Sequence, residues 1–172
     1  MKTNDREAAV RLIKQSGNEG YVYEESNGWV TFVIEGAVFD IKDSVIFYNP
    51  GYLVHYRYME DHGWQFRIFD KDEMVFEYTC DWTDELRIEK NSYELALIKE
   101  WIYEQGNSVE GLEDLFDGTA HHSDRSPAYA VAQKIGLVHY QWLSANYIDA
   151  DRLQEDCILD RYIQRRQETD LS

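Results

Sequence analysis

The sequence predicts an α+β fold in which helices pack on one face of an antiparallel sheet. Residues 20–80 are rich in aromatic and β-branched side chains that alternate with a period of two between short turn signals. From Asn91 onward the apolar residues instead recur every three or four positions. The connections between the strands are too short for a helical crossover, so the sheet must be antiparallel. We therefore expect an N-terminal helix, a β-meander of six or seven strands, and then three to four helices on one face of that sheet.

The first elements are a helix and a hairpin. Asn4 and Glu7 have the spacing of a capping arrangement and Gly17 supplies a stop, which predicts a helix over residues 5–16. Asn27-Gly28 is a strong signal for a two-residue hairpin, here between YVYEES (21–26) and WVTFVIE (29–35). In that register one face of the hairpin carries Tyr21, Tyr23, Val30, Phe32 and Ile34.

The remaining strands are predicted from short alternating segments. AVFDI (37–41) and SVIFY (44–48) come first, then two strands within HYRYMEDHGWQFRIFD (55–70), and then MVFEYTC (74–80). If the turn at residues 60–63 has an even number of residues, Val54, Tyr56, Tyr58, Gln65, Arg67 and Phe69 share one face, and His55, Arg57, Met59, Trp64, Phe66 and Ile68 share the other.

The second of these faces has two interpretations. It is too apolar for an ordinary solvated face and too charged for a sealed core. Either a helix covers it, with Arg57 paired to Glu77 or a neighbouring acid, or a partner protein docks on it with Trp64 and Phe66 as anchors.

Four helices are expected after the strands. Asn91 begins the first, which Gly106 ends, and Ser108 caps a short second one. Ser126-Pro127 starts the third and Asp149 caps the fourth. The apolar stripes of the first, third and fourth helices are Leu95, Ile98, Trp101 and Ile102; Val131, Ile135, Val138 and Trp142; and Leu153, Cys157, Ile158 and Tyr162.

We expect residues 1–172 to form a single domain, with a sheet half at about 20–80 and a helical half at about 91–168. A division near residue 87 would leave each half with an exposed apolar face. The start of the chain carries no apolar leader pattern, which favours a cytoplasmic protein.

The charge distribution limits the classes of partner. The formal net charge is −16, from 33 acidic and 17 basic residues, and residues 70–124 hold sixteen of the acids but four of the bases. Such a field repels nucleic acid and anionic lipid, and it attracts basic surfaces. The sequence therefore favours a basic protein partner, such as a toxin or a nuclease, over direct binding of nucleic acid or membrane.

One acidic run is a candidate partner-binding surface. It has no lysine or arginine before Arg125, and apolar side chains such as Trp101 lie within it. A desolvated aromatic anchor supplies affinity and the surrounding acids steer the encounter. The alternative is that the apolar residues of this segment simply pack on the sheet. The acids are Glu100, Glu104, Glu110, Glu113, Asp114 and Asp117.

The sequence offers little to support catalysis. There is no Gly-Xaa-Ser-Xaa-Gly motif and no phosphate-binding loop, and we expect no cofactor. Cys80 and Cys157 have acidic neighbours, which raise the pKa of a thiol and make it a poor nucleophile. His121, His122 and Asp124 are weak candidate metal ligands, and a small metal-assisted hydrolase is the alternative function that they suggest.

These observations favour a non-enzymatic binding protein that neutralises or regulates a basic protein partner. Small acidic α+β proteins of this kind occur among bacterial immunity proteins, other inhibitors of toxins or nucleases, and anti-defence proteins. A third hypothesis is an interaction module of a phage or a larger assembly, for which a homo-oligomer would be the first sign. The oligomeric state stays open.

Overall fold

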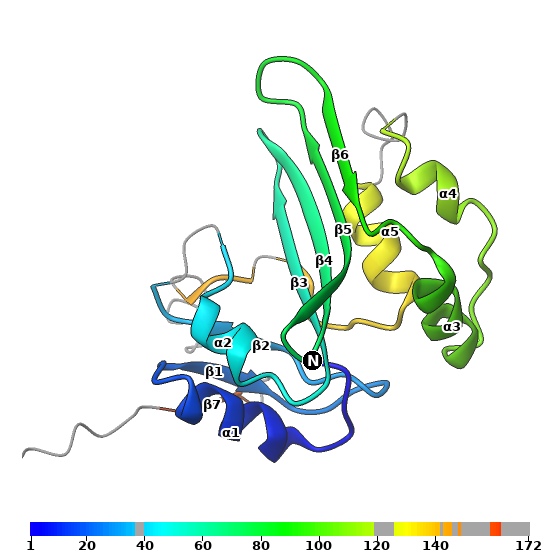
Figure 1. Ribbon diagram of the computed structural model, residues 1–172. Helices are drawn as coiled ribbons and strands as arrows, with labels where there is room; N and C mark the ends of the chain where they lie inside the picture. Colours follow the sequence, from blue (N-terminus) through cyan, green and yellow to red (C-terminus); the bar gives the residue numbers. More distant parts are fainter. Residues whose placement is uncertain (37–39, 119–125, 142, 146–147, 149–158, 163–172) are drawn as a thin grey trace, which may run out of the picture.

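The computed structural model describes residues 1–36, 40–118, 126–141, 143–145, 148 and 159–162, and it confirms the α+β class (Figure 1). The strands do not form one meander. They form two antiparallel sheets, a small one in the order β2-β1-β7 and a larger one in the order β3-β4-β5-β6. The small sheet and α1 lie at the lower end of the large sheet in Figure 1. The elements of this lower part are α1 (Arg6–Gln15), β1 (Gly20–Tyr23), β2 (Phe32–Ile34), α2 (Asp43–Phe47) and β7 (Leu159–Tyr162).

Helix α1 forms where the sequence predicts it. The Asp5 carboxylate, rather than Asn4, caps it by accepting a 3.0 Å hydrogen bond from the main-chain N–H of Glu7. Its apolar stripe is buried against the lower core together with Val22 and Leu53. The buried residues of the stripe are Ala9, Val10, Leu12 and Ile13.

The predicted hairpin turn is confirmed, but the prediction of which side chains share a face of the hairpin is wrong. Asn27 and Gly28 both have positive φ, as a type I′ turn requires, and the main chains of Ser26 and Trp29 exchange two 2.9 Å hydrogen bonds. Further along, Val22 pairs with Phe32, so the register has shifted by one residue. One extra residue on the first strand reverses its faces. As a result, Val22 shares a core with Val30, Phe32 and Ile34, whereas Tyr21 and Tyr23 pack elsewhere with Val33.

The strand predicted at residues 44–48 is wrong, because residues 44–47 belong to helix α2 and Tyr48 lies in the turn that follows it. Asp43 supplies an acidic residue in the first turn of α2, and Asn49-Pro50 follows its end. Val45 is buried in the lower core, whereas Phe47 is 71% exposed. The strand predicted at 37–41 lies partly outside the described residues.

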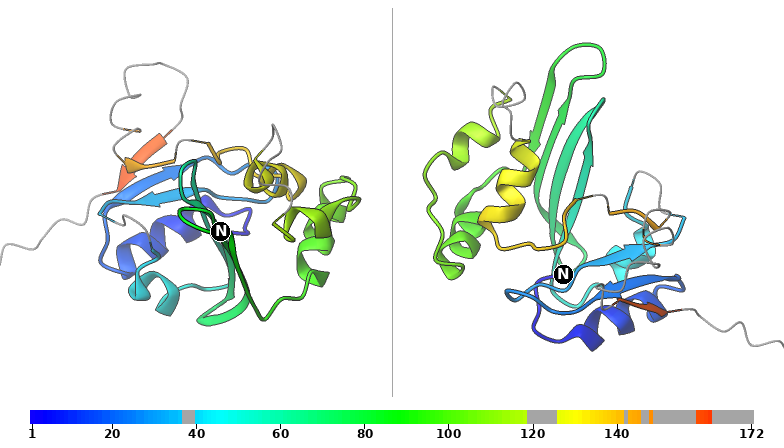
Figure 2. Two further views of the ribbon diagram at one scale, coloured as in Figure 1. Left: turned by 90° about the horizontal axis from the view of Figure 1, so that it is seen from above. Right: turned by 180° about the vertical axis from the view of Figure 1, so that it is seen from behind.

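The large sheet carries three helices on one of its faces, as all views in Figures 1 and 2 show. Its last strand was not predicted, because its sequence RIEKN is mostly polar and exposed. The elements are β3 (Tyr52–Met59), β4 (Gly63–Asp70), β5 (Glu73–Asp81) and β6 (Arg87–Asn91), with α3 (Ala96–Glu104), α4 (Leu112–Leu115) and α5 (Pro127–Lys134).

The predicted face assignment of β3 and β4 is wrong because the turn between them has three residues. Met59 pairs with Gly63, so Tyr58 lies opposite Trp64 and shares its face. A register shift between β4 and β5 then brings Phe76 and Tyr78 onto the same face. Trp64 and Phe66 are fully buried beneath the helices, so helices cover these two residues. His55, Arg57 and Met59, which were predicted to share their face, lie on the other face of the sheet.

The main core lies between the large sheet and its helices. Phe116, which follows α4, packs against Trp64, Phe66, Phe76 and Tyr78 with ring centroids 5.0–6.4 Å apart. The helices contribute further apolar residues to this core, namely Ile98, Trp101, Ile102, Leu112, Ala128, Val131 and Ile135.

Two predictions for the last part of the chain are wrong. Helix α5 ends before Gly136, whose φ of 85° is a typical C-terminal stop, so the stripe does not continue to Val138, which is 52% exposed. The end of the predicted final helix is strand β7, which pairs with β1. Residues 142 and 149–158 lie outside the described residues. Among the helices that are described, none has the length and apolar character needed to cross a membrane.

Candidate functional site

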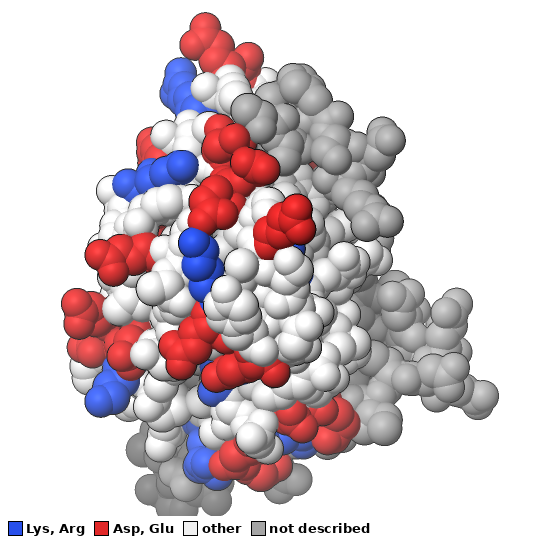
Figure 3. Space-filling model, turned by 90° about the vertical axis from the view of Figure 1, so that its right-hand side faces the viewer, with Lys and Arg blue, Asp and Glu red and all other residues white. Residues whose placement is uncertain are grey.

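The acidic run of residues 100–117 lies on the outer side of α3 and on the segment that leads through α4. All six acids predicted there are exposed. An ion pair of 2.6 Å between Lys99 and Glu113 connects the two helices. Figure 3 shows this side of the molecule, where acidic side chains border an uncharged area and outnumber the basic side chains scattered among them.

An exposed aromatic side chain lies within this surface, and it was not among the predicted site residues. Tyr103 is 65% exposed on α3. Glu100 and Glu104 lie three residues before it and one residue after it, so the three side chains occupy the same side of the helix. The sequence could have predicted this exposure, because Tyr103 falls outside the apolar stripe of α3 and therefore has no place in the core.

Trp101, the aromatic residue that the sequence analysis selected, belongs to the core. It is 2% exposed and packs edge to face on Trp29, with ring centroids 5.1 Å apart, and on Tyr52 at 5.6 Å. Trp64 and Phe66 are buried as well, so none of these three candidate anchors is at the surface.

The acids of this surface differ in how far they are neutralised. Glu104 pairs with Lys2 at 2.6 Å, and the Lys2 ammonium also lies 5.1 Å from the ring centre of Trp29. The hydrogen bond from Lys99 lowers the pKa of the Glu113 carboxyl. Within the described part of the chain, Glu100, Glu110 and Asp114 form no ion pair. Their charges are therefore available to a partner. We call the surface formed by Glu100, Tyr103, Glu104, Glu110, Glu113, Asp114 and Asp117 the acidic surface.

A second feature is a cleft of about 740 Å³ that runs along β3 and separates it from β2 and from the segment that contains Leu137 and Tyr140. Both β2 and β3 are edge strands of their sheets. Arg57, a predicted partner-binding residue, lines this cleft and therefore lies away from the acidic surface. A cleft of this size between two sheets is a candidate binding site.

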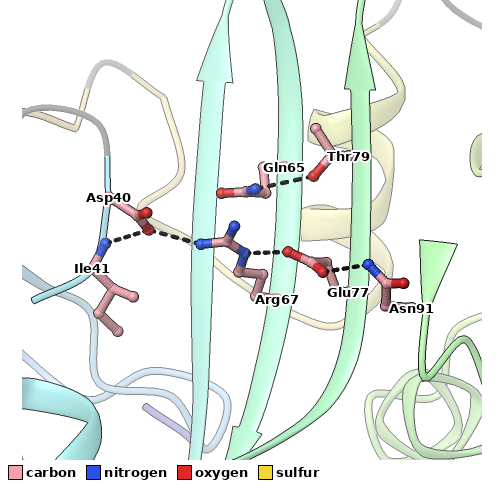
Figure 4. Close-up of polar contacts among 7 residues, drawn as sticks. All are labelled: Asp40, Ile41, Gln65, Arg67, Glu77, Thr79 and Asn91. Atoms are coloured by element: carbon pink, nitrogen blue, oxygen red, sulfur yellow. Dashed lines mark hydrogen bonds and ion pairs between the residues drawn. The ribbon is translucent and has the colours of Figure 1, made fainter. Parts of the chain in front are cut away.

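Polar side chains cover the sheet face beside this cleft, opposite the helices (Figure 4). The Arg67 guanidinium pairs at 2.7 Å with both Asp40 and Glu77, and Asn91 donates a 2.7 Å hydrogen bond to the other oxygen of Glu77. The predicted pairing of Arg57 with Glu77 is wrong, because the register shift between β4 and β5 places Arg67 opposite Glu77.

His55 lines the cleft in its neutral form. Burial lowers its pKa from 6.5 to about 4, and the nearby Arg67 and Arg57 act in the same direction, while Asp40 opposes them. Its Nδ1 atom is buried and has no hydrogen-bond partner among the described residues. A neutral imidazole in this position adds no positive charge to the cleft at pH 7.

The candidate metal ligands and cysteines can be compared with the described residues. Among them, no group of three His, Cys, Asp or Glu side chains is arranged to hold a metal ion. His121, His122 and Asp124 lie outside the described residues, and so does Cys157. Cys80 is a buried free thiol, and burial raises its pKa. A buried protonated thiol is a poor nucleophile.

No protein-family model, no curated protein and no solved structure matches the chain. Its function must therefore be argued from its own residues and their geometry.

Proposed function

We propose that the protein is a non-enzymatic binding protein that neutralises or regulates a basic protein partner, in the manner of an immunity protein, an inhibitor or an anti-defence protein. The observation that carries this proposal is the 65% exposure of Tyr103 on the same side of α3 as the exposed acids Glu100 and Glu104. The proposed contact is the acidic surface.

Tyrosine is well suited to this role. Its large ring buries much apolar area for little loss of side-chain entropy, and its hydroxyl group can form a hydrogen bond at the edge of an interface. Residues of this kind are enriched among those that dominate binding energy. In a free protein an aromatic ring that is more than half exposed is unfavourable, so a partner that covers Tyr103 removes that cost.

The acids around Tyr103 would supply steering and selectivity. Glu100 and Glu104 stand four residues apart on the helix, where like charges destabilise a helix by a few tenths of a kcal/mol. Lys2 offsets part of this repulsion through its ion pair with Glu104. A basic partner would relieve the remainder, and the net charge of −16 would accelerate its approach. The same field disfavours nucleic acid as the ligand.

We also propose that the protein acts in the cytoplasm. The supporting observation is that Cys80 is a buried, unpaired thiol, which is the usual state of cysteine in reducing compartments.

The proposal is tested by immobilising the full chain and passing over it an extract of its source cells at low and then high ionic strength. We expect a saturable basic protein to bind at low salt and to bind more weakly as salt screens the acids. Recovery of no basic protein, or an affinity that does not change with salt, would contradict the proposal.

A further inference from the structure

The edge of β3 that faces the cleft has main-chain groups free to pair with another strand. In an antiparallel ladder, successive residues direct their N–H and C=O groups to alternate sides. The carbonyl of Gly51 accepts from Lys71, toward β4, so the groups of Leu53, His55 and Arg57 also face β4. Those of Val54, Tyr56 and Tyr58 must then face the cleft.

The beginning of this edge is already paired. The main-chain N–H of Lys2 donates a 3.0 Å hydrogen bond to the carbonyl of Tyr52, which confirms that this set of residues points away from β4. Beyond Tyr52, no hydrogen bond from a described residue reaches the outward main-chain groups of Val54, Tyr56 or Tyr58.

β3 carries one charged residue, Arg57, but it lacks the other common features that protect an edge strand. Proteins commonly place a proline, a lysine or a β-bulge on an exposed edge to prevent further pairing. The strand YLVHYRYM contains neither residue, and its register with β4 is continuous over all eight positions. The described walls of the cleft leave space beside this edge. An extended polypeptide could therefore add to β3 as a new strand.

Three tyrosines and one acid at the end of β3 indicate which side chain such a strand would carry. The ring centroid of Tyr129, on α5, lies 4.9 Å from that of Tyr58 and 5.4 Å from that of Tyr140. Glu60 is exposed in the turn after β3, and Trp82 holds this turn by donating a 3.0 Å hydrogen bond to the Glu60 carbonyl. Tyrosine faces beside a carboxylate attract an ammonium or guanidinium group.

The other charged residues of the cleft are already engaged. Lys42 donates hydrogen bonds to Asn18 and to the carbonyl of Glu35, and Asp40 is paired with Arg67. Glu60 lines the same cleft and has no ion pair within the described part of the chain. Arg57 also lines the cleft, but it lies on the opposite face of β3 from Tyr58. The charge next to the tyrosines is therefore the negative charge of Glu60.

We infer that the partner contributes an extended basic segment that adds to β3 as a strand, pairing with the main chain of Val54, Tyr56 and Tyr58. Its lysine or arginine side chain then lies against Tyr58, Tyr129 and Tyr140, next to Glu60. The basic character of this segment rests on the proposed function, but the site is separate from the acidic surface.

The test uses isotope-labelled full-length protein and a capped peptide of alternating threonine and lysine, about as long as β3. Nuclear magnetic resonance then follows amide exchange and ring shifts. We expect the peptide to slow exchange at Val54, Tyr56 and Tyr58 and to shift the rings of Tyr129 and Tyr140. A peptide in which glutamate replaces lysine should have neither effect.

A matched pair of variants tests the main-chain pairing. Val54→Pro removes an outward N–H without removing a ladder hydrogen bond to β4, whereas Val54→Ala keeps that N–H. Binding of the basic peptide should weaken by at least about tenfold in Val54→Pro and persist in Val54→Ala. If the proline variant does not fold, Glu60→Gln provides the second test, since it should weaken the basic peptide several-fold without altering the β-ladder.

Three results would overturn the inference: equal binding by Val54→Pro and Val54→Ala, equal effects of the basic and acidic peptides, or shifts confined to the acidic surface. The last result would leave the proposed function intact. Conversely, strand addition of the peptide at β3, together with a partner affinity that is unaffected by neutralising Glu100 and Glu110, would support this site while weakening the role assigned to the acidic surface.

Discussion

Trp101 and Tyr103 are two residues apart on α3, yet they face opposite environments: Trp101 is 2% exposed and Tyr103 is 65% exposed. A separation of two residues turns a helix by roughly 200°, so the two rings must point away from each other. Trp101 meets Trp29 in the core, whereas Tyr103 accompanies Glu100 and Glu104 on the acidic surface. The same short segment therefore supplies both a packing residue and a candidate binding residue.

Replacing the two aromatic residues should separate stability from binding. Trp101→Ala should lower the free energy of unfolding by about 3–5 kcal/mol, because it leaves a cavity beside Trp29 and Tyr52. Tyr103→Ala should change it by less than about 0.5 kcal/mol, because an exposed side chain loses few contacts. Urea unfolding monitored by circular dichroism measures both values. A loss of more than about 2 kcal/mol in Tyr103→Ala would show that its ring belongs to the core.

Two glycine-to-alanine variants test the three-residue turn between β3 and β4. A side chain at Gly63 would collide with the main-chain carbonyl of Cys80 on β5, and the φ of Gly63 is 146°. Gly63→Ala should therefore lower the free energy of unfolding by at least about 2 kcal/mol. Gly51→Ala is the matched control, because open space surrounds that position. Equal stability of the two variants, measured by thermal unfolding, would contradict the register described here.

The turn between β3 and β4 also illustrates which features of the fold could be predicted from the sequence. The class, α1, the Asn27-Gly28 turn and the start of α5 at Pro127 depend on local signals, and these predictions are confirmed. Which face of a strand is buried depends on the number of residues in each turn and on bulges. One residue more or fewer in a turn reverses which face of the strand is buried, so local sequence patterns could not decide which face that is. Strand β7 is held by pairing with β1, which is more than a hundred residues away in the sequence.

Arg67 and Glu77 should be energetically coupled. Both side chains are largely buried, at 20% and 13% exposure, and Glu77 also accepts a hydrogen bond from Asn91. Arg67→Leu should cost about 1–3 kcal/mol, because it leaves a partly buried carboxylate without its partner. The double variant with Glu77→Leu should lose less than the sum of the single losses. A double-mutant cycle in urea measures this coupling, and strictly additive losses would contradict it.

The exposed ion pair between Lys99 and Glu113 provides the comparison for that cycle. Its side chains are 37% and 60% exposed, so water and salt screen their attraction. We expect the same kind of cycle there to give less than about 1 kcal/mol.

His55 should make the protein less stable in mild acid. Its pKa is about 4 in the folded protein against 6.5 in the unfolded chain, so between these values the unfolded chain binds a proton that the folded protein does not. The free energy of unfolding should consequently fall as the pH decreases from about 7 to 4. The penalty approaches ~3 kcal/mol below pH 4, since each pKa unit corresponds to about 1.4 kcal/mol.

Comparing the wild type with His55→Gln isolates this effect, because glutamine does not titrate. The variant should lose stability less steeply over this pH interval, as measured by urea unfolding at several pH values. A slope that is the same in both proteins would show that His55 titrates normally in the folded state.

The charge of the candidate site was predicted from the sequence, but its aromatic contact residue was not. Exposure of the six acids follows from their polarity, and each of them was predicted as a partner-binding residue. Trp101 was predicted as the aromatic anchor and Tyr103 was not, although the helical stripe that buries Trp101 also excludes Tyr103 from the core. The cleft beside β3 could not be predicted, because it depends on how two sheets are placed relative to each other.

The most direct test of the proposed function compares the affinity of the captured basic partner for two charge variants of equal net charge. One carries Glu100→Gln, Glu110→Gln and Asp114→Asn on the acidic surface. The other carries Asp72→Asn, Glu73→Gln and Glu85→Gln, which are exposed positions in the turns of the large sheet or, for Glu73, at the start of β5. We predict that titration calorimetry at low salt will show at least about tenfold weaker binding by the first variant and nearly unchanged binding by the second. Equal affinities of the two variants would contradict the assignment of the acidic surface as the partner-binding site.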